Sequence, residues 1–109
     1  MATRPDTLQG SLPLLILTIL DRRGPLHGYA ITGHIQSLSD ALRVEEGSLY
    51  PALHRMEEAG WIKARTIVTE HNRRARAYEI TSAGRRHLGI EEARWRSITD
   101  AVNYVLKHA

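Results

Sequence analysis

The sequence predicts a mainly α-helical domain with a two-stranded β-wing, arranged as a winged helix-turn-helix and followed by a long C-terminal helix. Two observations lead to this fold class. Apolar residues recur with the period of a helix in two segments before residue 60 and in one after residue 81, and the segment Leu14 to Leu20 is apolar nearly all round, as in a central, buried helix. Between them the period shortens to two, in β-branched segments on either side of a polar, basic stretch. The predicted order is therefore helix, helix, helix, hairpin and long helix.

The length and composition limit what the chain can be. With 109 residues it can build one hydrophobic core, and the absence of cysteine excludes disulfides, thiolate zinc sites and cysteine nucleophiles. No apolar run approaches the roughly 18 residues of a membrane span, and the N-terminus lacks the order of a signal peptide. We expect a cytoplasmic protein, associated with the nucleoid if it binds DNA. The expected parts are a flexible arm (residues 1–9), a winged helix-turn-helix (10–81) and a dimerisation helix (82–109).

Capping residues, prolines and glycines place the first two helices. The first is expected to begin at Ser11, to carry Pro13 in its first turn and to end at Gly24. The second is expected to open at Leu26-His27-Gly28, where we expect structural roles for His27 and Tyr29. Its predicted buried stripe consists of Ile31, Ile35 and Leu38.

The third helix and the hairpin follow without a long connection. Ser48 is expected to cap the helix and Gly60 to end it, with Pro51 at the third helical position. Its predicted buried stripe consists of Leu49, Leu53 and Met56. The strands are expected over residues 61–69 and 75–81, joined by a charged tip, with Tyr78 packed against the core.

The last helix is expected to start at the cap Thr81 and to run to about His108. At 1.5 Å per residue, roughly 25 residues give a rod of about 38 Å, which overhangs so small a domain. Its apolar seam needs a partner, for which we expect a second copy of the chain, assisted by that copy's first helix. The seam consists of Leu88, Trp95, Ile98, Val102 and Val105.

Positive charge is concentrated in the hairpin region. Between Trp61 and Arg86 seven basic residues oppose two acidic ones, so this segment carries +5 in a chain whose net charge is +3. Such a stripe indicates a polyanion partner, although an ordinary solvated face would look the same. We expect the third helix to enter the DNA major groove and the hairpin to meet phosphates or the minor groove. The candidate DNA-binding residues are Ser48, Tyr50, Pro51, His54, Arg55, Lys63, Arg73, Arg74 and Arg76, with Arg65 as a further backbone contact.

Other interpretations remain at this point. Tyr50 can instead pack against the hairpin, and His54 can pair with Glu58 one turn away. An enzyme is disfavoured, because no catalytic or metal-binding motif is present, and we expect no catalytic residue, cofactor or metal. A winged-helix adaptor that binds proteins rather than DNA is the more serious alternative. RNA binding is a further possibility, but the sequence shows no platform of exposed aromatic residues on which bases could stack.

Several short stretches resemble the PadR family of bacterial transcriptional regulators. They lie over residues 24–29, 47–57, 73–76, 78–81 and 83–86. The short C-terminal part is similar to the compact subfamily, in which one helix replaces a larger dimerisation domain. Residues 42–48 and 72–76 resemble an acidobacterial-type branch whose members are often associated with permease-type transport genes.

The resemblance implies a specific function. The family implies a transcriptional regulator, for which we expect a repressor that binds double-stranded DNA as a homodimer, and the operator should be pseudo-palindromic because a two-fold dimer presents two third helices. In some compact members an aromatic residue near the position of Trp95 lines a pore between subunits that takes flat apolar drugs. Trp95 is therefore either a packing residue of the dimer interface or a contact for a small hydrophobic effector.

Overall fold

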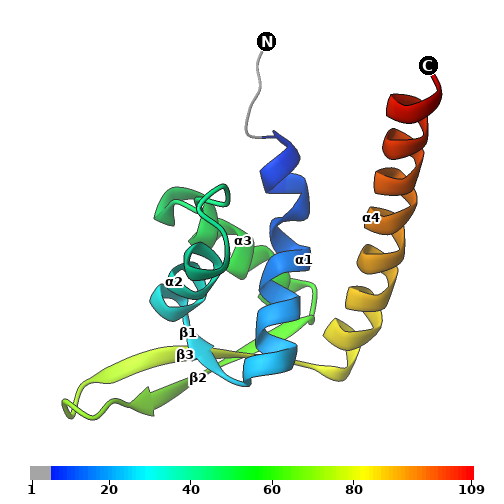
Figure 1. The fold of residues 1–109 in the computed structure, drawn as a ribbon. Coiled ribbons are helices and arrows are strands. Elements are labelled where there is room, and N and C mark those ends of the chain that lie inside the picture. Colours follow the sequence, from blue (N-terminus) through cyan, green and yellow to red (C-terminus); the bar gives the residue numbers. More distant parts are fainter. Residues whose placement is uncertain (1–5) are drawn as a thin grey trace.

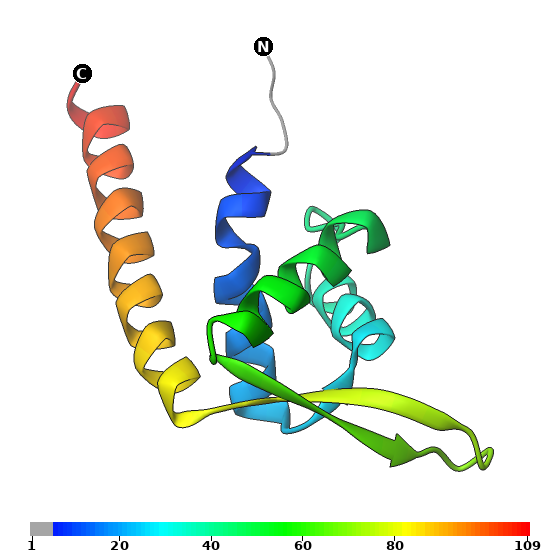
Figure 2. The ribbon, with the colours of Figure 1, turned by 180° about the vertical axis from the view of Figure 1, so that it is seen from behind.

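The computed structural model describes residues 6–109 and contains four helices and one small sheet (Figure 1). The elements are α1 (Asp6–Arg23), β1 (Leu26–His27), α2 (Gly28–Leu38), α3 (Glu46–Glu58), β2 (Ile62–Val68), β3 (Arg74–Ile80) and α4 (Ser82–His108). In both ribbon views α1 stands between α4 on one side and α2 with α3 on the other, and the β2–β3 hairpin projects from their base (Figures 1 and 2). The mainly helical prediction is confirmed. No helix among the described residues is long and apolar enough to cross a membrane.

The first helix begins earlier than its capping signal indicated. It starts at Asp6, so residues 6–9 of the expected arm are helical, and the rest of that arm lies outside the described residues. Pro13 consequently sits inside the helix rather than in its first turn. The predicted end is correct, because Gly24 adopts a left-handed conformation (φ 84°) and donates its N–H to the Leu20 carbonyl over 3.1 Å.

The sheet has three strands rather than the predicted two. The extra strand, β1, occupies Leu26–His27, where the sequence predicted the start of a helix, and it pairs antiparallel with β3. The sheet order is β1-β3-β2, so β3 is central. The second helix therefore begins at Gly28, and His27 caps it by accepting the Ala30 N–H at Nδ1 over 3.2 Å.

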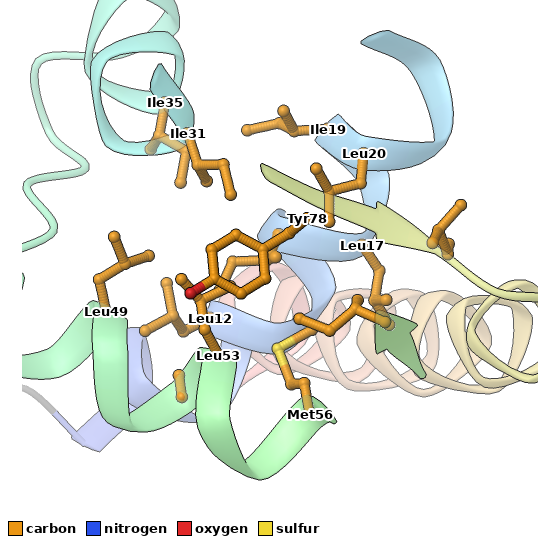
Figure 3. Close-up of a cluster of buried hydrophobic side chains, with 14 residues drawn as sticks. Leu12, Leu17, Ile19, Leu20, Ile31, Ile35, Leu49, Leu53, Met56 and Tyr78 are labelled. Atoms are coloured by element: carbon orange, nitrogen blue, oxygen red, sulfur yellow. The ribbon is translucent and has the colours of Figure 1, made fainter. Parts of the chain in front are cut away.

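The core lies where α1, α2, α3 and the base of the sheet meet (Figure 3). Among the described residues its buried members are all apolar or aromatic, and each large side chain contributes about 1.5–3 kcal/mol through removal from water. The predicted stripe of α3 is confirmed in full, as is the core position of Tyr78. The stripe of α2 is wrong at Leu38, which is 70% exposed because it ends the helix beside an open cavity.

The third helix also starts before its predicted cap. It begins at Glu46, after Glu45 in extended backbone, and no side chain caps it. Ser48 lies in the first turn, where its N–H bonds to the Glu45 carbonyl over 2.9 Å, and Pro51 lies inside the helix. The predicted end is correct, since Gly60 follows the helix with φ 83°.

The hairpin joins α4 through one residue, Thr81. Its hydroxyl caps α4 by accepting the Gly84 N–H over 3.0 Å and donates to the Gly60 carbonyl over 2.6 Å. Gly84 is pressed so closely onto this junction that a Cβ there would overlap the Trp61 carbonyl oxygen. The ring of Trp61 also stacks on His87 of α4, with 3.6 Å between ring centroids. The base of α4 is thus fixed to the hairpin, while its C-terminal half projects away (Figure 2).

Candidate nucleic-acid interface

A wide groove of about 1040 Å³ separates the hairpin from the N-terminal ends of α2 and α3. Basic and aromatic side chains dominate its lining, with Glu70 as its one acidic member. The lining residues are His27, Gly28, Tyr29, Tyr50, Thr69, Glu70, His71, Arg73, Arg74, Ala75, Arg76 and Tyr78. The groove is open to solvent and combines cations, hydroxyl groups and ring faces, which are the groups that contact phosphates and bases.

Tyr50 borders the groove because Gly28 leaves room for it. The Tyr50 side chain is 44% exposed, and its ring lies over Gly28 at the start of α2. A Cβ on Gly28 would lie 2.8 Å from Tyr50 Cε1 and 2.9 Å from its hydroxyl oxygen. Tyr50 therefore packs on α2, rather than on the hairpin as the alternative from the sequence had it, and still borders the groove, so its contact with DNA stays a prediction.

The arginines of the hairpin differ in their surroundings. Arg73 and Arg74 are exposed at the tip, which turns through Asn72 in a left-handed conformation (φ 59°). Arg76, by contrast, contacts Glu57 of α3 over 2.9 Å between Nη2 and Oε2 and lies 5.9 Å from the centroid of the Tyr78 ring. The hydrogen bond and charge of Glu57 raise the pKa of Arg76 above its ordinary value, so its guanidinium stays charged.

The strand register separates the basic residues of the hairpin into two faces. Arg74 and Arg76 stand opposite Val68 and Thr66, on the face that turns towards the core and the groove. Lys63 and Arg65 alternate with those positions and so occupy the other face, where Arg65 pairs with Glu79 over 3.7 Å. The structure thus unites Arg73, Arg74 and Arg76 with Tyr50 but does not bring Lys63 to the groove.

The remaining candidates of α3 lie outside the groove. Pro51, His54 and Arg55 are exposed, whereas Ser48 is half-buried. His54 Nε2 lies 3.4 Å from Glu58 Oε2, so the pairing weighed from the sequence is present. Both partners are more than two-thirds exposed, and such a pair holds the histidine only weakly. These side chains are available on the surface of α3, and their contact with DNA stays a prediction.

Among the groove residues that the sequence did not single out as contacts, His71, His27 and Tyr29 carry rings that could meet a ligand. His71 is at the hairpin tip, and the only indication in the sequence that it could contact a ligand was its place in a charged loop. His27 has the expected structural role, because its Nδ1 accepts the capping bond, and its Nε2 is left to face other partners. A structural role for Tyr29 was wrong, since its side chain is 74% exposed and has only a loose stack on His27, with ring centroids 6.2 Å apart.

The seam of α4 is largely uncovered. Leu88 packs against the core, whereas Trp95, Ile98, Val102 and Val105 are between 44% and 59% exposed. Two cavities of about 270 and 290 Å³ lie on either side of Trp95, between α4 and α1. One of them is lined by Leu14, Leu38 and Leu42 among others. This apolar surface is the feature that the sequence attributed to a second copy of the chain.

Comparisons with known proteins agree with this architecture. The model of the "Transcriptional regulator PadR-like family" matches residues 16–90. No curated protein matches the chain.

Three solved structures illustrate the likeness. A PadR-like transcriptional regulator from Bacillus cereus is 26% identical, with a TM-score of 0.83 over 96% of this chain and 100% of that one. A transcriptional regulator from Clostridium thermocellum is 29% identical, with a TM-score of 0.82 over 92% and 97%. A PadR family transcription regulator from Clostridium difficile is 30% identical, with a TM-score of 0.77 over 89% and 99%.

Proposed function

Because the chain belongs to the PadR-like family of transcriptional regulators, we propose that it is a repressor that binds a pseudo-palindromic DNA operator as a homodimer. In this proposal α3 is the recognition helix and the β2–β3 hairpin is the wing. The protein would act at the nucleoid, without a cofactor or metal. Its place in the compact, acidobacterial-type branch stays a prediction.

The groove between α3 and the hairpin is the observation that carries the proposal. Tyr50 comes from the helix, and Arg73 and Arg74 come from the hairpin tip on the opposite side. A sugar-phosphate strand that leaves the major groove at α3 would pass between them before it reaches the minor groove. Lys63 faces the other way, so we place it in the outer flank of the footprint, where it can meet only a neighbouring phosphate.

Salt dependence is the first test of DNA binding. If each copy neutralises about three phosphates, a dimer neutralises about six, and the slope of log affinity against log salt concentration should be roughly −5. Fluorescence anisotropy with a labelled duplex, repeated from low to high salt, measures this slope. If the salt slope is near zero even with the best duplex selected from random DNA, the protein does not bind DNA, and the protein-binding adaptor is favoured.

Two substitutions separate helix from wing. Arg74→Ala should weaken binding to operator and random duplex alike and should lower the steepness of the salt slope by about one for each phosphate lost. Tyr50→Ala should weaken operator binding more than random binding, by about 1–3 kcal/mol if the side chain reaches a base edge. Circular dichroism checks that both variants are folded. The reverse pattern would mean that the two elements have exchanged roles.

The uncovered seam supports the dimer. Trp95, Ile98, Val102 and Val105 have about half of their surface still to bury, which corresponds to about 3–6 kcal/mol per copy. This gain is comparable with the cost of association, so a stable dimer must also cover the cavities beside α1. Sedimentation velocity tests this: the native chain should run as a dimer and Val102→Glu as a monomer.

The same cavities support a small apolar or aromatic effector at Trp95. Trp61 and Trp95 are the two tryptophans of the chain, so Trp61→Phe leaves Trp95 as the sole reporter. Titration of this variant with a flat aromatic probe such as 9-aminoacridine, without DNA, should quench the Trp95 fluorescence to saturation. Saturable quenching that persists unchanged in the Leu14→Asn variant would place the probe elsewhere and leave Trp95 as a packing residue.

A further inference from the structure

Glu57 and Arg76 join the proposed recognition helix to the proposed wing. Glu57 lies in the last turn of α3 and Arg76 in the middle of β3, and their Oε2 and Nη2 atoms are 2.9 Å apart. Among the side chains that the structure describes, no other hydrogen bond or ion pair connects α3 with the hairpin strands. The carboxylate is the less exposed partner, at 26% against 62% for the guanidinium. The arginine therefore lies across the surface towards a relatively fixed acceptor.

Arg76 is also the outermost point at which the body of the protein holds the hairpin. The base of the hairpin is anchored in the core by Ile62, Tyr78 and Ile80, all buried. Beyond Arg76, Arg74 and its partner Val68 are exposed, and the tip projects freely. Asn72 at the tip is four residues further on, about 14 Å at 3.4 Å per residue. A rotation of about 10° at Arg76 would move the tip by roughly 2 Å, enough to break a hydrogen bond to a phosphate.

We propose that Arg76 is a positioning residue, whose bond to Glu57 fixes the distance between α3 and the hairpin tip and so contributes to operator specificity. The inference rests on the proposed function. It revises the role expected for Arg76, because a guanidinium engaged with Glu57 is not free to neutralise a phosphate. It also gives a role to Glu57, whose carboxylate bonds to a residue of the proposed DNA-binding groove although a negative charge near a duplex is otherwise repelled.

Glu79→Gln is the matched control for Glu57→Gln. Both variants remove one negative charge and break one Arg–Glu pair of the hairpin. The Glu79 pair with Arg65 stays within the hairpin, on the face away from the groove, whereas the Glu57 pair crosses to α3. An effect of charge alone should therefore appear in both variants, and an effect of position only in Glu57→Gln.

The first measurement needs no DNA. The chain lacks cysteine, so Gln36→Cys in α2 and His71→Cys at the tip introduce two unique sites for spin labels. In the Val102→Glu background, which separates the copies, pulsed electron-electron double resonance then gives the distribution of distances between body and tip within one chain. We expect Glu57→Gln and Arg76→Lys to broaden or shift this distribution and Glu79→Gln to leave it unchanged. An unchanged distribution in Glu57→Gln would overturn the proposal.

The second measurement is a double-mutant cycle on DNA binding. In the native background Arg76→Gln should lower the ratio of operator to random affinity by about two- to fivefold, the range of an exposed ion pair. In the Glu57→Gln background it should lower the ratio no further, because the bond is already lost. A direct phosphate contact predicts instead an equal loss on both duplexes in both backgrounds, which would overturn the proposal. If the native protein binds no duplex, the proposed function fails, and the distance measurement still decides whether Glu57 fixes the hairpin.

Discussion

Gly28→Ala should impair operator binding without unfolding the protein, although Gly28 carries no side chain that could contact DNA. The added Cβ would lie 2.8 Å from Tyr50 Cε1, whereas ordinary contacts of this kind begin near 3.4 Å. The three atoms nearest to the added Cβ all belong to the Tyr50 side chain, so the ring must retreat by about 0.6 Å or more. The substitution therefore displaces the group that we place at the DNA.

The expected sizes of the two effects differ. A hydroxyl moved by this distance loses a good hydrogen bond, so operator affinity should fall by about 1–3 kcal/mol, or roughly 5- to 150-fold. Stability should stay within about 1 kcal/mol of the native value, because alanine is the better helix former and the ring that must move is flexible. Gly33→Ala is the control, since Gly33 lies in the same helix with nothing within 4 Å of its added Cβ.

Anisotropy titrations and urea unfolding of the two variants decide the matter. Gly33→Ala should be more stable by about 0.5–1 kcal/mol and should bind DNA as the native chain does. In a Tyr50→Ala background Gly28→Ala should cost no further affinity, because the clashing ring is gone. If Gly28→Ala binds the operator as well as Gly33→Ala does, the position of Tyr50 is irrelevant to binding and the reasoning is refuted.

Three further substitutions test the packing. Gly84→Ala should destabilise the fold by about 3 kcal/mol or more in urea unfolding, because the overlap is with the Trp61 backbone, whereas Gly89→Ala in the same helix, with open space around it, should not destabilise it. Thr81→Ala loses a cap and a bond to Gly60 and should cost about 1–2 kcal/mol by the same measurement; an unchanged midpoint would mean that water replaces both bonds. Ile35→Ala should cost about 2–5 kcal/mol, while Leu38→Ala should stay within about 0.5 kcal/mol when measured on the Val102→Glu background that separates the copies.

The sequence was informative where a local signal was strong. Thr81 could be assigned as a cap because threonine is a favoured capping residue and directly precedes the last helical segment, and Gly24 and Gly60 mark true helix ends. Ser48 failed as a cap because residues before it continue the helix, and a serine in a first turn looks the same in sequence. The strand Leu26–His27 has two residues, which are too few to show a period-two pattern in the sequence. It forms because its backbone pairs with Tyr78 and Ala77 at the edge of β3.

The candidate site could be predicted only in part for a similar reason. The charges at the hairpin tip are visible in the sequence, so the position of Arg73 and Arg74 at the edge of the groove could be anticipated, while their contact with DNA stays a prediction. Which face Lys63 occupies depends on the register of the two strands, which the turn at Asn72 sets. The bond between Glu57 and Arg76 joins residues 19 positions apart and depends on how the hairpin crosses α3, for which no local pattern exists.

The single residue between β3 and α4 has a mechanical consequence. Thr81 bonds to Gly60 and Gly84 packs on the Trp61 carbonyl, so β3 and α4 are joined rigidly and should move as one body. In a dimer built on α4, the crossing angle of the two α4 helices therefore determines the distance between the two hairpins. A small molecule bound beside Trp95 that shifts the two α4 helices by a few ångströms would change the distance between the two hairpins. Because the helical repeat of the duplex is fixed, the hairpins would then no longer match both half-sites.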